Sequence, residues 1–198
     1  MDKLKLASRL SAALNAPFIT AITFIPLVLL SGVGIKDALL LIAITSFFGC
    51  ILPLAMVYGL LRLKIIKDFY AYDRGTRFIP FLWMTLFYLI GTLSLIFISA
   101  PTSVTALMAC YFVNGVVLML VTLKWKISIH ASGITSPFTA LVYLLGAVTL
   151  PLLLVVIPVA WARVELKAHT ILQVIVGAIL SCVLTWLQMS FYMPRLFI

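Results

Sequence analysis

The sequence predicts an all-α fold, a polytopic transmembrane helical bundle with six or seven spans. Hydrophobic residues make up 65% of the 198 residues and charged residues only 10%, and the mean hydropathy is +1.27. Soluble domains carry about 45–50% apolar and about 25% charged residues. Long apolar runs follow one another without an internal repeat or low-complexity tract. We therefore expect one transmembrane domain over residues 1–198, and the composition excludes an ordinary soluble protein.

The spans follow from apolar runs that approach the roughly 20 residues needed to cross a bilayer core. The first 15 residues alternate basic and apolar positions at helical spacing, which predicts a segment lying along the membrane interface. The next apolar run is long enough to remain as a span, so no cleavable signal peptide is expected. The expected spans are 16–33, 37–61, 78–99, 102–124, 129–148, 149–163 and 169–192.

The sixth of these spans has a competing interpretation, because Ser136–Ala160 can also be taken as a single span, which gives six in all. The seven-span version makes the sixth span short, with Pro151 at its start and Pro158 inside it. Neighbouring helices can support such a segment. Hydropathy does not separate the two versions. The charges favour seven spans, since twelve of the fourteen Lys and Arg residues then share one side, leaving Lys36 and Arg195 on the other.

The net charge of +9 is large for so few charged residues. Such a charge can set the orientation of the chain in the membrane, bind anionic lipid headgroups or bind an anionic substrate. Basic residues favour the cytoplasmic side of a membrane. Lys3, Lys5 and Arg9 lie apart from the polar clusters described next, and they place the crowded side in the cytoplasm as well. We expect an integral protein of a prokaryotic inner (plasma) membrane, with the crowded face cytoplasmic.

Three polar clusters interrupt the apolar runs. They are Lys67–Pro80 in the one sizeable loop, Lys124–Gly133 with Ser128 and His130 at a helix start, and Ala162–Gln173 with Arg163, His169 and Gln173. Taken alone, each cluster is explained by Lys and Arg side chains that reach the lipid headgroups or by a hydrogen bond between helices. Together they suit an oxyanion, because guanidinium groups grip phosphate oxygens in pairs and helix N-termini bind anions. A neutral imidazole can attack phosphorus, and a protonated one can supply a proton to the leaving oxygen.

Residue types and spacing also indicate how His169 could be oriented and whether a metal or cofactor site is expected. His169 and Gln173 would lie at i and i+4 on one face of a helix, so the amide oxygen can accept from one ring nitrogen. Two histidines without paired ligands make a metal site unexpected, and no cofactor or nucleic-acid partner is expected. The cysteines sit deep in apolar runs, where they are expected to pack as small apolar residues: Cys50, Cys110 and Cys182.

The three clusters resemble the motifs of the type 2 phosphatidic acid phosphatase superfamily, K-x-x-x-x-x-x-R-P, P-S-G-H and S-R-x-x-x-x-x-H-x-x-x-D. The first is similar to Lys67 followed by Arg74, with Gly75 where the family has proline. The second is similar to Ile127–His130, which keeps the serine and histidine. The third is similar to Ala162–Gln173, with alanine for serine and glutamine for aspartate. The resemblance covers residues 60–192, which would form a phosphatase-type helical core.

The resemblance implies a role for each matching position and a reaction that uses no metal. His169 would be the nucleophile, forming a phosphohistidine, and His130 would protonate the leaving group. Gln173 would orient the nucleophile in place of the family's aspartate. The substrate phosphate would be bound by the side chains of Lys67, Arg74, Ser128 and Arg163 and by the backbone of Ile129. We add Arg77 because it lies on the same loop as Arg74; its alternative role is contact with lipid headgroups.

An active site at the membrane interface favours a phosphorylated lipid, such as a polyprenyl diphosphate, phosphatidylglycerol phosphate, phosphatidic acid or a lipid A phosphate. The expected enzyme is thus a membrane lipid phosphatase that hydrolyses the terminal phosphate. Two alternatives remain. The altered motifs and Gln173 also suit a non-catalytic protein that binds or carries an anionic lipid, and a lipid phosphotransferase would share the phosphohistidine. The sequence leaves the oligomeric state open.

Overall fold

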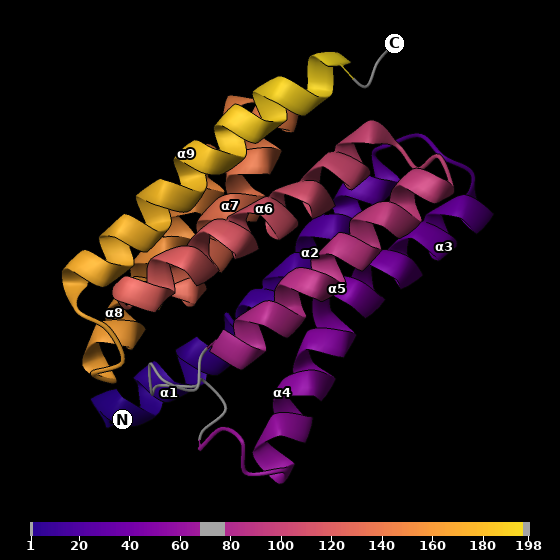
Figure 1. Cartoon of the computed structure of the whole chain (residues 1–198). Coiled ribbons are helices and arrows are strands. Elements are labelled where there is room, and N and C mark those ends of the chain that lie inside the picture. Colours follow the sequence, from indigo (N-terminus) through magenta and orange to yellow (C-terminus); the bar gives the residue numbers. More distant parts are fainter. Residues whose placement is uncertain (1, 68–77, 196–198) are drawn as a thin grey trace.

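A computed structural model of the chain describes residues 2–67 and 78–195. Every regular element in these residues is helical, which confirms the expected all-α class (Figure 1). The elements are α1 (Lys3–Ala13), α2 (Ala16–Leu29), α3 (Ile35–Ser46), the π-helix η1 (Phe47–Ile51), α4 (Leu52–Arg62), α5 (Phe78–Phe97), α6 (Thr102–Lys124), α7 (Ile129–Leu145), the 3₁₀-helix η2 (Ala147–Val155), α8 (Val156–Glu165) and α9 (Ile171–Arg195).

The lengths and apolar composition of these helices indicate a membrane protein. Among the described residues, five segments are long and apolar enough to cross a bilayer: Ile35–Arg62, Phe78–Phe97, Thr102–Lys124, Ala147–Glu165 and Ile171–Pro194. A sixth arises if α1 and α2, bent by 44° at their junction, are counted as one broken span. Helix α7 is apolar but shorter, at 17 residues. The helix limits lie within a few residues of most spans predicted from hydropathy.

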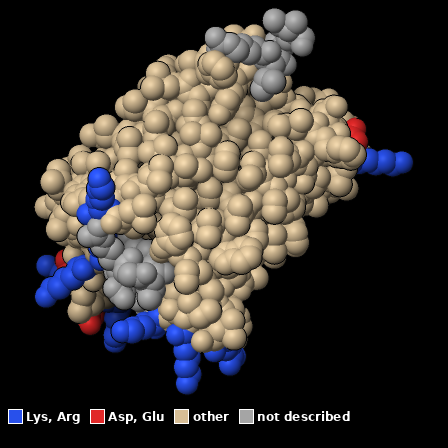
Figure 2. Space-filling view, in the orientation of Figure 1, with Lys and Arg blue, Asp and Glu red and all other residues tan. Residues whose placement is uncertain are grey.

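The surface of the molecule is apolar along its length and charged at its ends. Many large hydrophobic side chains are exposed, among them Phe97 at 89% and Val148 at 82%. Such surface is compatible with a lipid environment. Figure 2 shows Lys and Arg gathered at the end where α1 and the end of α4 lie in Figure 1. A small charged group lies at the opposite end, where α3 begins with Lys36 and Asp37.

A break at Gly146 separates α7 from the segment that follows. Gly146 has φ +81°, a left-handed conformation that residues with a Cβ seldom adopt, and the nine-residue 3₁₀-helix η2 then packs against α7. Ser136–Ala160 is therefore not one continuous helix, and the number of membrane spans stays a prediction. Pro151 lies inside η2, where its missing N–H removes a backbone donor. Helix α8 consequently ends at the same end of the bundle at which α7 begins.

A π-helical turn interrupts the long helical segment Ile35–Arg62 close to the pocket described in the next subsection. Pro53 has no N–H to bond the carbonyl of Gly49 four residues earlier, which accounts for the widened turn η1. Gly49 touches α2 here, since a Cβ at this position would lie 2.7 Å from Thr20 Cγ2. Beyond the turn, Pro53 and Leu54 face a pocket at the charged end of the bundle.

Buried polar side chains join α6, α7 and α9 in the interior. Asn114 Nδ2 donates to Ser136 Oγ at 3.0 Å and to Thr185 Oγ1 at 2.9 Å. Gln188 Nε2 donates to Asn114 Oδ1 at 2.9 Å. Hydrogen bonds of this kind hold transmembrane helices in one relative position. They fix the three helices whose ends carry residues of the second and third polar clusters.

Candidate active site

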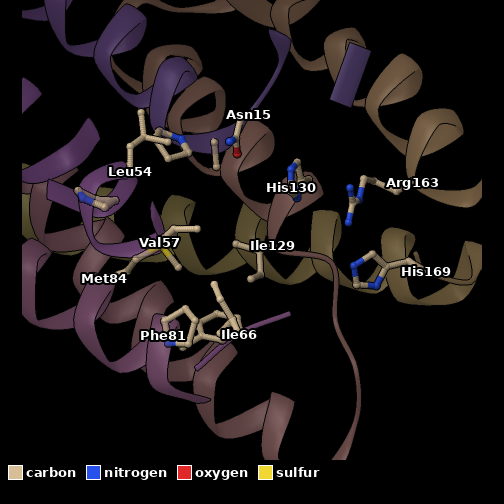
Figure 3. Close-up of a pocket in the computed structure, with 14 residues that line it drawn as sticks. Asn15, Leu54, Val57, Ile66, Phe81, Met84, Ile129, His130, Arg163 and His169 are labelled. Carbon is tan, nitrogen blue, oxygen red and sulfur yellow. The ribbon is translucent and has the colours of Figure 1, made fainter. Parts of the chain in front are cut away.

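A pocket that is partly open to the outside lies at the charged end of the bundle. Its polar side chains are Asn15, His130, Arg163 and His169, which come from four separate segments. The remaining lining comes mainly from α2, α4, α5 and the start of α7, and it is largely apolar. Figure 3 shows Arg163 beside both histidines, with Asn15 beyond His130. The pocket therefore combines a polar end with an apolar wall.

His130 reaches the pocket because the first turn of α7 is pressed against α9. The backbone N–H of Ser128 donates to the carbonyl of Gln173 at 3.3 Å, and Ser132 Oγ donates to the carbonyl of Gly177 at 3.0 Å. A Cβ on Gly177 would lie 2.8 Å from the carbonyl oxygen of Ser128, so only glycine allows this approach. Ile129 and His130 are the first two residues of α7, at the N-terminus of the helix.

Ser128, predicted to line the phosphate site, is placed as the N-cap of α7. Its Oγ accepts from the N–H of Ala131 at 3.4 Å, and the side chain is fully buried outside the pocket lining. Serine is a preferred N-cap residue. Its role in the structure is to start the helix that carries Ile129 and His130, both of which line the pocket.

A tight turn at the end of α8 holds Arg163 and His169 together. The N–H of Ala168 donates to the carbonyl of Arg163 at 3.0 Å and that of Lys167 to Val164 at 2.9 Å, the two bonds of a Schellman motif. The N–H of His169 also donates to the Arg163 carbonyl, at 3.2 Å. Lys167 occupies the left-handed position of the motif, with φ +52°. The backbone thus sets the spacing of two site residues.

Replacing Lys167 tests this turn. Lys167→Gly removes the Cβ strain of a left-handed residue, whereas Lys167→Ala removes the charge and keeps the strain. We expect the glycine variant to exceed the alanine variant by about 1 kcal/mol in the free energy of unfolding. Unfolding of both detergent-purified variants, followed by tryptophan fluorescence, measures the difference. Equal stability of the two would contradict the strained turn.

Arg163 is held by the N-terminal helix. Its side chain is 1% exposed, and Nη1 donates to Ser11 Oγ at 2.9 Å. Ser11 and Ala7 are fully buried, and α1 packs against α8. The N-terminal segment, predicted to lie along the membrane interface, thus contributes to the site, and its position relative to a bilayer stays a prediction. Sequence reasoning missed Ser11, which lies 152 residues from its partner.

His169 and Gln173 are in contact, although not for the reason expected. His169 precedes α9, which begins at Ile171, so the assumption that both lie on one helix is wrong. His169 Nδ1 lies 3.3 Å from Gln173 Oε1. The same oxygen accepts from the N–H of Thr170 at 3.1 Å, and the N–H of Gln173 donates to Thr170 Oγ1 at 3.3 Å. This reciprocal pair is a capping box, so Gln173 both starts α9 and contacts the His169 ring.

The two roles of Gln173 are separable by mutation. Gln173→Glu keeps the capping box and is expected to leave stability within about 0.5 kcal/mol of wild type, whereas Gln173→Ala loses about 1 kcal/mol. If His169 is the nucleophile, the alanine variant also loses its orientation, and phosphate release is expected to fall about tenfold or more. Parallel unfolding and turnover measurements on both variants test this. Equal turnover in the alanine and glutamate variants would contradict an orienting role.

Of the remaining predicted phosphate ligands, the structure describes only Lys67, and it does not line the pocket. Lys67 follows α4 with an exposed side chain and is absent from the lining, whereas its neighbour Ile66 is 2% exposed and lines the pocket. Arg74 and Arg77 lie outside the described residues. Arg163 is therefore the cation that the described part of the pocket contains.

A second pocket continues from the first toward the middle of the bundle. It ends among Leu118, Asn114 and Ser136 on α6 and α7, and its walls are mainly apolar. The two cavities share the lining residues Ala16, Pro17, Phe81, Met84 and Ile129. A ligand with a polar end and an apolar chain fits this arrangement, because each part meets a surface of its own kind.

Comparison with family models, curated proteins and solved structures gives no match for this chain. Within residues 2–67 and 78–195, no three His, Cys, Asp or Glu side chains are grouped so that they could hold a metal ion. The cysteines are free thiols: Cys50 and Cys110 are buried, and Cys182 is partly buried, where its sulfur accepts from Thr139 Oγ1 at 3.3 Å. Function has to be inferred from the residues of the pocket.

Proposed function

We propose that this chain is an integral membrane lipid phosphatase, related to the type 2 phosphatidic acid phosphatase superfamily, that works through a phosphohistidine. The observation that carries the proposal is the meeting of His169, His130 and the buried Arg163 in one pocket whose lining is otherwise apolar except for Asn15. Two imidazoles and a guanidinium match the needs of phosphoryl transfer: a nucleophile, a proton donor and a phosphate clamp.

In the first step, His169 attacks the terminal phosphorus. The contact between Nδ1 and Gln173 Oε1 favours the tautomer with the proton on Nδ1, which places the lone pair on Nε2. An N–P bond forms while the bond from phosphorus to the bridging oxygen breaks. His130 gives a proton to that oxygen, so a neutral hydroxyl or a protonated lipid phosphate leaves. Arg163 balances the charge of the phosphoryl oxygens.

The second step returns the enzyme to its starting state. A water molecule attacks the phosphohistidine, and His130, now neutral, takes one of the water protons. The N–P bond breaks, inorganic phosphate leaves, and His169 recovers its lone pair. Protons and charges balance over the two steps, with water as the sole co-reactant. Ile129 and His130, the first residues of α7, line the pocket, and helix N-termini favour the binding of phosphate oxygens.

The apolar lining and the second cavity favour a phosphorylated lipid over a soluble phosphate. An apolar wall accommodates a hydrocarbon chain, whereas it offers no hydrogen-bond partner to the polar remainder of a soluble phosphate. Substrates of suitable chemistry are polyprenyl diphosphate, phosphatidylglycerol phosphate and phosphatidic acid. In this proposal the helical segments cross the membrane seven times, and the charged end faces the cytoplasm of a prokaryotic plasma membrane.

Phosphate release by the detergent-purified protein tests the proposal. The panel holds polyprenyl diphosphate, phosphatidylglycerol phosphate and phosphatidic acid, each with and without EDTA. We expect release from at least one lipid that continues in EDTA. Phosphate release that stops in EDTA and returns with a divalent ion would contradict the proposed chemistry. The absence of phosphate release from every lipid of the panel would contradict it as well.

A second candidate function is the binding or carriage of an anionic lipid without catalysis. It is favoured by the exposure of Lys67 and by the use of Gln173 in a capping box where the family has an aspartate. A binder would hold lipid phosphate equally well before and after His169→Ala and release none. Measured lipid affinity beside turnover separates the two functions.

A further inference from the structure

We infer that Asn15, together with the N-terminus of α2, binds the inner phosphate of a diphosphate substrate and makes the pocket selective for lipid diphosphates over lipid monophosphates. This inference rests on the proposed function. The family motifs contain no counterpart of Asn15, which lies outside all three polar clusters of the sequence. Four observations carry it: the burial of Asn15, its unused side chain, its place beyond His130, and the donors that surround it.

Asn15 is a buried polar side chain at the pocket wall. It is 8% exposed, lines the pocket, and has no side-chain hydrogen bond within the described residues. It is the N-cap of α2, yet its side chain does not cap the helix. Its amide atoms are not among the fully buried unpartnered atoms of the described residues, so they are open to the pocket, where a ligand or water can bond them.

A close helix contact brings Asn15 alongside His130. Gly133 lies three residues after His130 on α7, and a Cβ on Gly133 would overlap that of Ala16, the first residue of α2. The start of α2 therefore rests directly on the helix face that carries His130. In Figure 3 the polar side chains follow in the order His169, Arg163, His130 and Asn15, and the apolar wall lies beyond them.

This order places Asn15 on the leaving-group side of the transferred phosphate. In the proposed reaction phosphorus lies within reach of His169, and the bridging oxygen lies near His130. The atoms next along the substrate then face Asn15. In a lipid diphosphate these atoms belong to the inner phosphate, whereas in a lipid monophosphate they belong to the alcohol.

The groups around Asn15 are mainly donors, which favours an anion over a hydroxyl. The amide supplies two N–H bonds. Pro17 has no N–H, and the N–H groups of Phe18 and Ile19 both donate to the Asn15 carbonyl, at 3.0 and 3.2 Å. The N–H of Ala16 is the one left in this first turn without a hydrogen-bond partner among the described residues. The partial positive charge of the helix N-terminus adds to this preference.

Two substrates that differ by one phosphate test the inference. They are a prenyl diphosphate and the prenyl monophosphate of the same chain, compared by kcat/KM from initial rates in detergent. Wild type is expected to prefer the diphosphate. Asn15→Ala is expected to lower the ratio of the two values about tenfold, the size of one lost hydrogen bond to a charged group. Asn15→Asp is expected to lower it further by charge repulsion.

Ser8→Ala is the matched control, because Ser8 is an exposed polar residue on α1, in the same N-terminal segment as Asn15, and does not line the pocket. It should keep the wild-type ratio. A ratio that does not change in Asn15→Ala would overturn the inference, and so would equal losses on both substrates. Thermal unfolding of each variant identifies a loss due to folding, which lowers both rates together.

Binding of the same two lipids separates this inference from the proposed function. If wild type releases no phosphate but Asn15→Ala weakens the binding of the diphosphate alone, the phosphatase proposal fails and the inference stands for a lipid-binding protein. If wild type releases phosphate and Asn15→Ala alters neither the affinity ratio nor the rate ratio, the phosphatase stands and the inference fails.

Discussion

His169→Ala is expected to lower phosphate release from the best lipid substrate by at least about 1,000-fold, as loss of a covalent nucleophile does in other enzymes. No other side chain can form the phosphoenzyme in the proposed mechanism. The side chain is 6% exposed and lies against Gln173, so the substitution should leave the bundle folded. Single-turnover phosphate release measures the loss of catalysis, and a lipid-binding measurement on the same variant shows whether the folded bundle still binds its substrate.

His130→Ala provides the matched comparison, because the proposal gives it a different task. A lipid alkoxide needs a proton in order to leave, whereas p-nitrophenolate leaves without one. In single turnover, which reports the first step alone, we therefore expect His130→Ala to slow release of the lipid alcohol about 100-fold or more and release of p-nitrophenolate clearly less. His169→Ala should lose both activities. Similar losses for His130→Ala on the two substrates would contradict its role as proton donor.

Arg163→Lys is expected to lower kcat/KM at least about 100-fold although the positive charge is kept. Lysine cannot reproduce the planar fork that binds two phosphate oxygens while Nη1 donates to Ser11. The loss should appear mainly in the affinity for inorganic phosphate or vanadate as competitive inhibitors. Inhibition constants for both proteins measure it.

Ser11→Ala is the control for Arg163. It removes one hydrogen bond to the guanidinium and keeps the fork, so we expect a loss of about 1–3 kcal/mol in the free energy of unfolding. Its kcat/KM should fall far less than that of Arg163→Lys. If both variants lose turnover equally, the arginine acts through its packing against α1 and not through the phosphate.

The helical architecture could be predicted from the sequence because the bilayer permits few solutions for the backbone. Apolar runs of the right length must be helical in lipid, and the predicted limits differ from the observed ones by a few residues. The reversal at Gly146 follows from its left-handed backbone, which hydropathy does not register. The distribution of Lys and Arg indicates which residues share a side of the membrane. It favoured a chain break between α7 and α8, and the structure has such a break at Gly146.

The pocket could be predicted in part. Motif spacing identified His130, Arg163 and His169, and all three line one cavity. It could not reveal that Lys167 turns the chain so that His169 precedes α9, since that turn depends on a left-handed lysine. Ser11 and Asn15 belong to the site through contacts between distant segments, which no local pattern encodes.

The most direct test of the central claim is to trap the phosphoenzyme. The detergent-purified protein is mixed with its lipid substrate, quenched in base within milliseconds, digested and analysed by mass spectrometry. A phosphohistidine is stable in base and lost in acid. We expect phosphate on the peptide that contains His169, absent in His169→Ala and accumulated in His130→Ala with p-nitrophenyl phosphate. Turnover without a phosphorylated peptide, or phosphate on another residue, would contradict the account.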